Sequence, residues 1–152
     1  MDECVLLHAL RGVDAHDLLD DSSVTFLGLL FYNCHSIVFT NEIRGAFYRA
    51  VNEGASLGRR GDLLYPGVLH ILKQILGTPT KSVWVNPDAV VLRDTFPDED
   101  EYLVKAALLA SVHLVTDDGE LISAVGASPQ CKQVGVAAMM PREAIESVSA
   151  PE

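Results

Sequence analysis

The chain has 152 residues, of which 49% are hydrophobic; this suits one folded domain over residues 1–152 and excludes a disordered chain. The net charge of −10, from 21 acidic and 11 basic residues, repels nucleic acid at long range and favours basic partners or metal ions. Three widely spaced cysteines, Cys4, Cys34 and Cys131, support neither a disulfide framework nor a zinc site. The longest apolar run, residues 24–32, is too short to span a membrane and follows no signal-peptide pattern, so we expect a cytoplasmic protein without membrane attachment.

The first half of the chain is expected to be mostly helical. Apolar spacing and turn residues predict a helix over residues 2–12, a loop over 13–21, and a helix over 22–33 capped by Ser22 or Ser23. A buried strand over 36–40 precedes a helix over 42–52 that ends near Gly54. The segment 55–61, with glycines and a pair of arginines, is expected to be a flexible basic loop.

The second half alternates strands and helices. A helix is expected over 62–76 with Pro66 in its first turn, then short strands over 81–85 and 89–92. A helix over 98–111, a strand over 113–116, a short helix over 120–125, a last strand over 134–139 and a last helix over 141–147 follow. This alternation predicts an α/β fold in three layers, with a mainly parallel central sheet flanked by helices.

Acidic residues gather where two of these elements meet. Asp100 lies on the apolar side of its helix, in the stripe of Leu103 and Val104, and the strand over 113–116 ends at Asp117 and Asp118. Functional residues of parallel sheets collect at the carboxyl ends of the strands. Carboxylates that converge from different elements are what a divalent cation needs, so Asp100 and Asp118 are candidate metal ligands.

Each acid also has a purely structural interpretation. Asp100 would then stabilise a helix N-terminus, and Asp118 would form an Asx turn before Gly119. Glu42 would be a first-turn helix charge, and Asp117 would be solvated.

Basic side chains form one candidate site for phosphate. Arg59 and Arg60, with Arg44 and Arg49 on the preceding helix, are the best candidates for phosphate contacts in this acidic chain. The alternative is a solvated loop beside an ordinary charged helix. Trp84 is interpreted as a core or interface aromatic.

Three segments of the chain resemble those of the PIN-domain family. DEDEYLVKAALLASVHLVTDD (98–118) resembles the family's acid that opens a helix, followed by an "LVT-x-D" strand end, which are here Asp100 and Leu114-Val115-Thr116-x-Asp118. DECVLLHALRG (2–12) resembles the segment that carries the family's first acid, here Asp2. VGVAAMMPREAI (134–145) is similar to the closing strand and the helix after it.

The resemblance implies a PIN-like fold and a function. It implies a metal-dependent endoribonuclease of a family that includes the toxins of toxin–antitoxin pairs, in which Mg²⁺ or Mn²⁺ activates a water that hydrolyses RNA phosphodiesters. The catalytic and metal-binding residues would be Asp2, Asp100 and Asp118, with Glu42 as a fourth metal ligand. The partners implied are an RNA substrate, contacted by the arginines named above, an antitoxin-like protein and a second copy of the chain in a homodimer.

The chain also departs from the family pattern. Cys4 stands where the family has Asn, Ala46 stands where it has an acid one turn after Glu42, and the chain begins without the apolar strand that precedes the first acid. These departures favour the alternative function, a catalytically inactive PIN-like module that binds other proteins. A receiver-like signalling domain ranks lower, because no lysine follows the Asp117-Asp118 strand at a suitable position.

Overall fold

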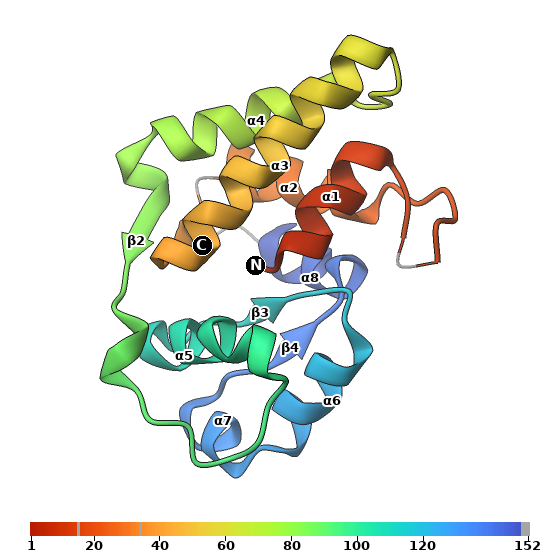
Figure 1. Ribbon diagram of the computed structural model, residues 1–152. Coiled ribbons are helices and arrows are strands. Elements are labelled where there is room, and N and C mark those ends of the chain that lie inside the picture. The colour runs from red at the N-terminus through yellow and green to blue at the C-terminus, as the bar shows by residue number, and fades with distance from the viewer. Residues whose placement is uncertain (15, 34, 150–152) are drawn as a thin grey trace.

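The computed structural model describes residues 1–14, 16–33 and 35–149. Helices dominate, and short strands separate them (Figure 1). The α-helices are α1 (Glu3–Arg11), α2 (Ser22–Tyr32), α3 (Asn41–Arg60), α4 (Pro66–Gly77), α5 (Glu101–Ala110), α6 (Gly119–Ala127), α7 (Pro129–Val134) and α8 (Pro141–Ser149). The strands are β1 (Ile37–Phe39), β2 (Ser82–Trp84), β3 (Leu114–Val115) and β4 (Ala138–Met139). Short 3₁₀ helices cover Pro79–Lys81, Pro87–Ala89 and Asp98–Asp100.

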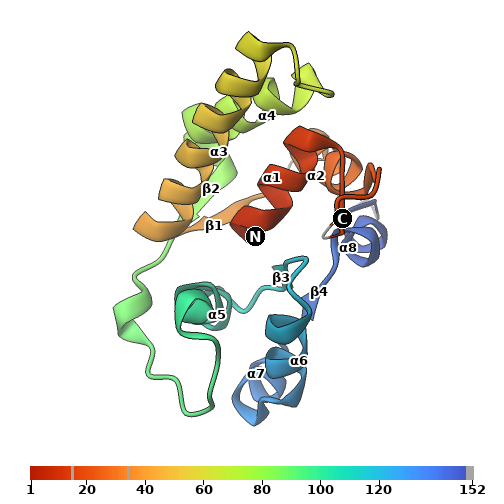
Figure 2. The ribbon, with the colours of Figure 1, turned by 45° about the vertical axis from the view of Figure 1, so that its right-hand side comes forward.

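The strands form two parallel pairs. β1 pairs with β2, with Phe39 opposite Trp84, and β3 pairs with β4, with Val115 opposite Met139. The molecule is therefore of mixed α/β type with parallel strands, as expected from the alternation of elements. Among the described residues the two pairs are separate two-stranded sheets, and no hydrogen-bonded ladder joins them (Figure 2).

The core lies mainly between the helices of the first half. α1 packs against α2, α3 and α4, and it buries Val5, Leu6, Ala9 and Leu10, the apolar stripe expected of this helix. Gly12 ends it in the left-handed conformation with φ of 68°, as a helix C-terminal glycine commonly does. The predicted first helix and the loop after it are thus confirmed.

Helix α3 is longer than its sequence predicts. It continues through Gly54 to Arg60, so the predicted end near Gly54 and the predicted loop over 55–61 are both wrong. A Cβ at Gly54 would lie 2.8 Å from Cδ2 of Leu10. The glycine therefore lets α1 approach α3 closely, and the packing outweighs the roughly 1 kcal/mol helix penalty of glycine. Gly61, with φ of 80°, ends the helix instead.

Most other predicted elements are present, with changes at their ends. α2 begins after Asp21, and neither Ser22 nor Ser23 is its N-cap. α4 begins only at Pro66, which occupies its first turn. The predicted strand over 89–92 is not a strand; its first residue belongs to the 3₁₀ helix Pro87–Ala89. Only Val134 of the predicted last strand lies in a helix, the end of α7, which was not predicted, and β4 is limited to Ala138–Met139.

The two parallel pairs lie in different parts of the molecule. In Figure 2, β1 and β2 lie among α1 to α4, whereas β3 and β4 lie beside α5, α6 and α7. α8 returns to pack against α2. The start of α1 meets the end of β3, where the amide of Asp2 donates to the carbonyl of Val115 at 3.0 Å. The part of the molecule that contains β1 and β2 therefore meets the part that contains β3 and β4 at the acidic residues named above.

Candidate active site

Asp100 is a buried acid at the start of α5. Its residue is 8% exposed, as expected for an acid on the apolar side of the helix. Within residues 1–14, 16–33 and 35–149, its carboxylate has neither a hydrogen-bond donor nor a basic partner. Burial, and then the charges of Asp2, Asp118 and two glutamates, raise the pKa of Asp100 to about 6. The structure thus places an uncompensated carboxyl among other acids.

Asp2 is held in a fixed orientation at the start of α1. It occupies the N-cap position but does not cap the helix with its side chain. Its Oδ2 instead accepts hydrogen bonds from the hydroxyl of Thr116, at 2.7 Å, and from the thiol of Cys4, at 3.0 Å. Both donors are neutral, so the negative charge of Asp2 is oriented and is not cancelled.

Thr116 and Cys4 are the hydrogen-bond partners of Asp2. From the sequence, Cys4 is named only as a departure from the family pattern, and the Thr116 hydroxyl is not singled out. Thr116 is fully buried, and its Oγ1 also accepts a hydrogen bond from the amide of Asp118 at 3.0 Å. Burial and the charge of Asp2 raise the pKa of the Cys4 thiol to about 12, so the thiol stays protonated and can donate. Cys4 therefore supplies the hydrogen-bond donor that an Asn would supply. The "LVT-x-D" pattern marked Thr116, but only as part of a strand end.

Asp118 has a structural task as well as a charge at the site. Its Oδ1 accepts from the amides of Glu120, at 2.8 Å, and Leu121, at 3.2 Å, and so caps α6. The Asx turn expected of Asp118 is therefore present, and it also caps the helix. The same carboxylate lies near enough to Asp100 to contribute to the raised pKa of that acid.

Tyr102 and a surface ion pair border the acids. Burial, and then Asp2 and Asp100, raise the pKa of the Tyr102 phenol to about 12. Beside it, the Arg49 guanidinium forms two hydrogen bonds to the carboxylate of Glu3, at 2.8 and 2.6 Å. This bidentate pair joins α3 to the start of α1 next to Asp2.

Four predicted site residues lie outside this cluster. Glu42 is exposed in the first turn of α3, and Ala46, one turn later, is buried. Arg59 and Arg60 lie in the last turn of the same helix, roughly 22 Å along its axis from Arg44 at 1.5 Å per residue. The predicted arginine patch is therefore not a single surface, because the segment that holds Arg59 and Arg60, expected to be a loop, is helical.

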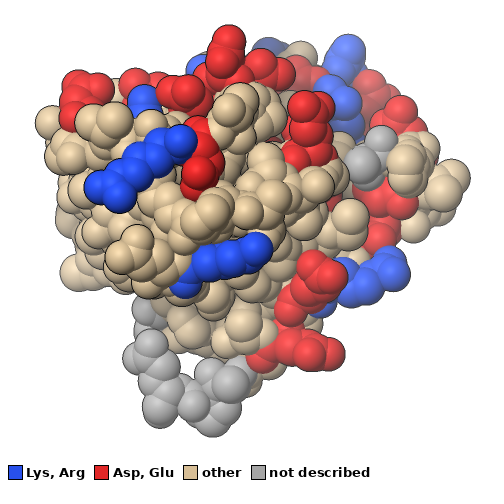
Figure 3. All heavy atoms as spheres, turned by 90° about the horizontal axis from the view of Figure 1, so that it is seen from below, with Lys and Arg blue, Asp and Glu red and all other residues tan. Residues whose placement is uncertain are grey.

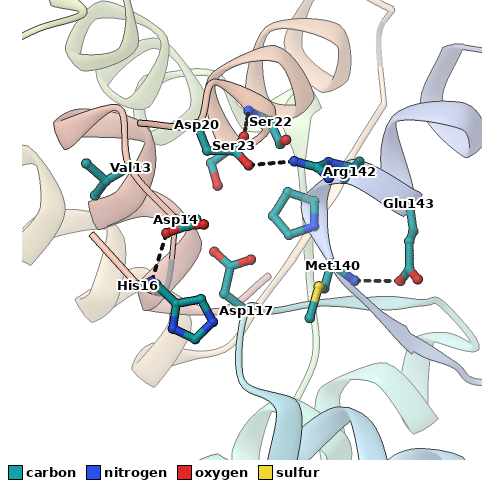
Figure 4. Close-up of a pocket in the computed structure, with 11 residues that line it drawn as sticks. Val13, Asp14, His16, Asp20, Ser22, Ser23, Asp117, Met140, Arg142 and Glu143 are labelled. Carbon is teal, nitrogen blue, oxygen red and sulfur yellow. Dashed lines mark hydrogen bonds and ion pairs between the residues drawn. The ribbon is translucent and has the colours of Figure 1, made fainter. Parts of the chain in front are cut away.

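Asp117 differs from its predicted solvated state. Its Oδ2 lies 2.6 Å from Nδ1 of His8, and the two side chains are only 13% and 17% exposed. The carboxylate points into a hollow of about 370 Å³ that Asp14, Pro141 and Met140 also line (Figure 4). Neither Asp2 nor Asp100 lines this hollow. Asp117 therefore belongs to a neighbouring feature and not to the acidic cluster.

The cluster is not a complete metal site as it stands. Among the described residues, no three His, Cys, Asp or Glu side chains are grouped so that they could hold a metal ion. On the face seen in Figure 3, basic side chains are interspersed with acidic ones and form no continuous basic surface. No described helix is both long and apolar enough to cross a membrane.

Comparisons of the chain with protein-family models, with curated proteins and with solved structures found no match.

Proposed function

We propose that the chain is a PIN-like metal-dependent endoribonuclease whose site is built on Asp2, Asp100 and Asp118. The observation that supports it most is the state of Asp100, whose carboxyl is buried and has neither a donor nor a basic partner among the described residues. Burial, and then the charges of neighbouring acids, raise its pKa. A buried carboxylate in such surroundings is costly unless a cation offsets its charge. Perturbed acids of this kind cluster at functional sites more often than elsewhere.

The donor chemistry of these residues fits Mg²⁺ or Mn²⁺. Mg²⁺ keeps several waters and commonly takes only one or two carboxylates from the protein. Asp100 and Asp2 would hold the ion. Asp118, whose Oδ1 already accepts two amide hydrogen bonds, could add its Oδ2 only if it moved closer, because no three described side chains are grouped as metal ligands. A bound ion would polarise a phosphate and lower the pKa of a water that attacks it.

The surrounding residues of the chain have positioning tasks. Thr116 and Cys4 fix the orientation of the Asp2 carboxylate by hydrogen bonds to its Oδ2. Partners of this kind commonly contribute 10–100-fold to metal affinity or activity. Arg49 lies next to Asp2 through its bond to Glu3 and is a cation that could contact a phosphate.

The test is RNA cleavage by the purified chain with Mn²⁺, with EDTA as the metal-free control. We expect Asp100→Asn to lose at least about 100-fold in rate, because losing a ligand should cost more than losing a residue that orients one. The matched control is Asp98→Asn, two residues earlier and exposed. Cleavage that persists in EDTA, or that is equal in the two variants, would contradict the proposal.

A second candidate is a catalytically inactive PIN-like module that binds proteins. Ala46, 2% exposed, stands where the resemblance leads us to expect an acid, and no three-residue metal group is found among the described residues. This candidate requires an intact fold with neither Mn²⁺ binding nor cleavage. The antitoxin-like partner, the homodimer and the cytoplasmic location remain predictions.

A further inference from the structure

An exposed aromatic and arginine cluster, made of Trp84, Tyr48 and Arg44, lies where β2 ends beside the first turns of α3. The two aromatic residues are 52% and 47% exposed, and together they form an exposed aromatic patch, which is more informative than a single exposed ring. Trp84 was expected in a core or an interface, yet much of it faces solvent. The sequence alone does not place these three side chains together.

The cluster is ordered by contacts on its inner side. The Trp84 ring lies 5.7 Å from that of Phe39, which packs at 5.1 Å against Phe47 in the core. Cζ of Arg44 lies 5.3 Å from the Tyr48 ring and 5.5 Å from the Trp84 ring. The Arg44 guanidinium also donates a hydrogen bond to the Tyr48 hydroxyl at 3.1 Å. A planar cation is thus held between two rings before any ligand arrives.

The charge of Arg44 is available to an anion. Arg11, Arg49 and Arg142 each pair with a carboxylate. In the part of the chain that the structure describes, Arg44 has no such partner and rests only on aromatic rings. A stacked guanidinium keeps its outer N–H groups free for a phosphate.

Helix α3 links the cluster to Arg49, which lies beside Asp2. Trp84 is the last residue of β2, opposite the last residue of β1, and α3 begins two residues after β1. Arg44 precedes Arg49 by five residues on α3, about 7.5 Å along the axis, and Arg49 binds Glu3 beside Asp2. A hollow of about 260 Å³ lined by Phe39, Arg44 and Trp84, among others, adjoins the rings. It has room for one small planar group rather than a drug-sized ligand.

We infer that Trp84, Tyr48 and Arg44 form a stacking subsite for an unpaired nucleobase. An aromatic face takes the base, and the Arg44 guanidinium binds the adjoining phosphate. This is how proteins hold single-stranded nucleic acid without reading its sequence. The inference rests on the proposed ribonuclease function, since it assigns the base to a nucleotide close to the phosphate held at the acids.

Trp84 is the only tryptophan of the chain, so its fluorescence reports on this subsite alone. The full chain would be titrated in EDTA with a single-stranded oligoadenylate, and separately with an oligonucleotide of equal length and charge whose sites are all abasic. We expect oligoadenylate to quench the fluorescence in a saturable way and the abasic strand to leave it nearly unchanged. Equal responses to both strands, or no response to either, would overturn the inference.

Substitutions test the stacking subsite through their effect on oligonucleotide affinity. Trp84→Ala should weaken oligoadenylate binding about tenfold, within the range for loss of one stacked base, while Trp84→Phe should retain most of it. Arg44→Lys should keep the salt dependence of binding, whereas Arg44→Ala should reduce its slope by about one. The controls are Tyr32→Ala and Arg93→Ala, which change exposed residues away from the cluster.

The experiments can contradict the subsite and the ribonuclease function independently of each other. Base-dependent quenching without metal-dependent cleavage would support the subsite and contradict the nuclease. Cleavage that is unchanged by Trp84→Ala, with silent fluorescence, would contradict the subsite and leave the nuclease standing. If Trp84→Ala changes only the sedimentation of the protein, and not its oligonucleotide affinity, the cluster is a protein contact and the inference is wrong.

Discussion

The Asp100 carboxyl makes the folded state depend on pH in a defined direction. Its pKa rises from 3.8 to about 6 on folding, so the folded state holds this proton more tightly than the unfolded state does. The resulting stabilisation is fully present below pH 3.8 and is lost as the pH rises through about 6. Asp100→Asn, which keeps a neutral side chain at every pH, should therefore stabilise the protein at pH 7.5 by about 1 kcal/mol, because solvent at the carboxylate screens part of the effect.

Thermal unfolding of both proteins at several pH values measures this effect. The gain of Asp100→Asn over the wild type should shrink towards zero near pH 4, where the native carboxyl is itself protonated. Asp98→Asn, at an exposed position, should show no comparable gain. A wild type more stable than Asp100→Asn at pH 7.5 without metal would mean that Asp100 has a cation or a donor partner.

The hydroxyl of Thr116 forms hydrogen bonds to two acidic residues. It donates to Asp2 and accepts from the amide of Asp118. Thr116→Val keeps the shape but leaves buried groups without partners, which should cost about 1–3 kcal/mol of unfolding free energy. Thr116→Ser retains the hydroxyl and should cost less. Urea unfolding of the two variants tests this order, and equal losses would show that the methyl group, not the hydroxyl, matters.

Sequence reasoning located some site residues and missed others for physical reasons. The inward position of Asp100 follows from helical periodicity, a local property, and the structure confirms its burial. The partners of Asp2 are different, because Thr116 reaches it only through contacts between segments 114 residues apart. The solvated state predicted for Asp117 was wrong for the same reason, since His8 approaches from α1.

Two glycines on helix α3 differ in their surroundings. A Cβ at Gly54 would lie 2.8 Å from Leu10 and 3.1 Å from Leu69, whereas one at Gly58 would meet only Leu63, at 3.8 Å. Gly58→Ala should stabilise the protein by roughly 0.5–1 kcal/mol through helix propensity. Gly54→Ala should instead destabilise it by about 1 kcal/mol, because the buried Leu10 must move.

Chemical denaturation of these two variants gives a paired measurement on one helix. Stabilisation by both substitutions would indicate that α1 and α3 are less tightly packed than described. The same contact explains why the predicted end of α3 was wrong. A glycine indicates the end of a helix only where tertiary packing does not require a glycine inside the helix. The sequence around Gly54 does not show that Leu10 packs against it.

At the scale of the whole molecule, the acidic site depends on global folding. Asp2 comes from the start of α1, Asp100 from the start of α5, and Thr116 and Asp118 from the segment after β3. Parallel strand pairing and helix order were predictable from alternating patterns, and so was the meeting of acids at a strand end. The division of the strands into two separate pairs could not be predicted, because which strands pair depends on contacts between residues far apart in the sequence.

Mn²⁺ binding to the purified chain tests the central claim most directly. Calorimetric titration at pH 7.5 should show saturable binding by the wild type and by Asp98→Asn, and a loss of binding in Asp100→Asn. At 100 times the Kd, Mn²⁺ should raise the Tm of the wild type by roughly 5–10 °C and leave that of Asp100→Asn unchanged. No binding by the wild type, or equal binding by Asp98→Asn and Asp100→Asn, would show that these acids do not form a metal site.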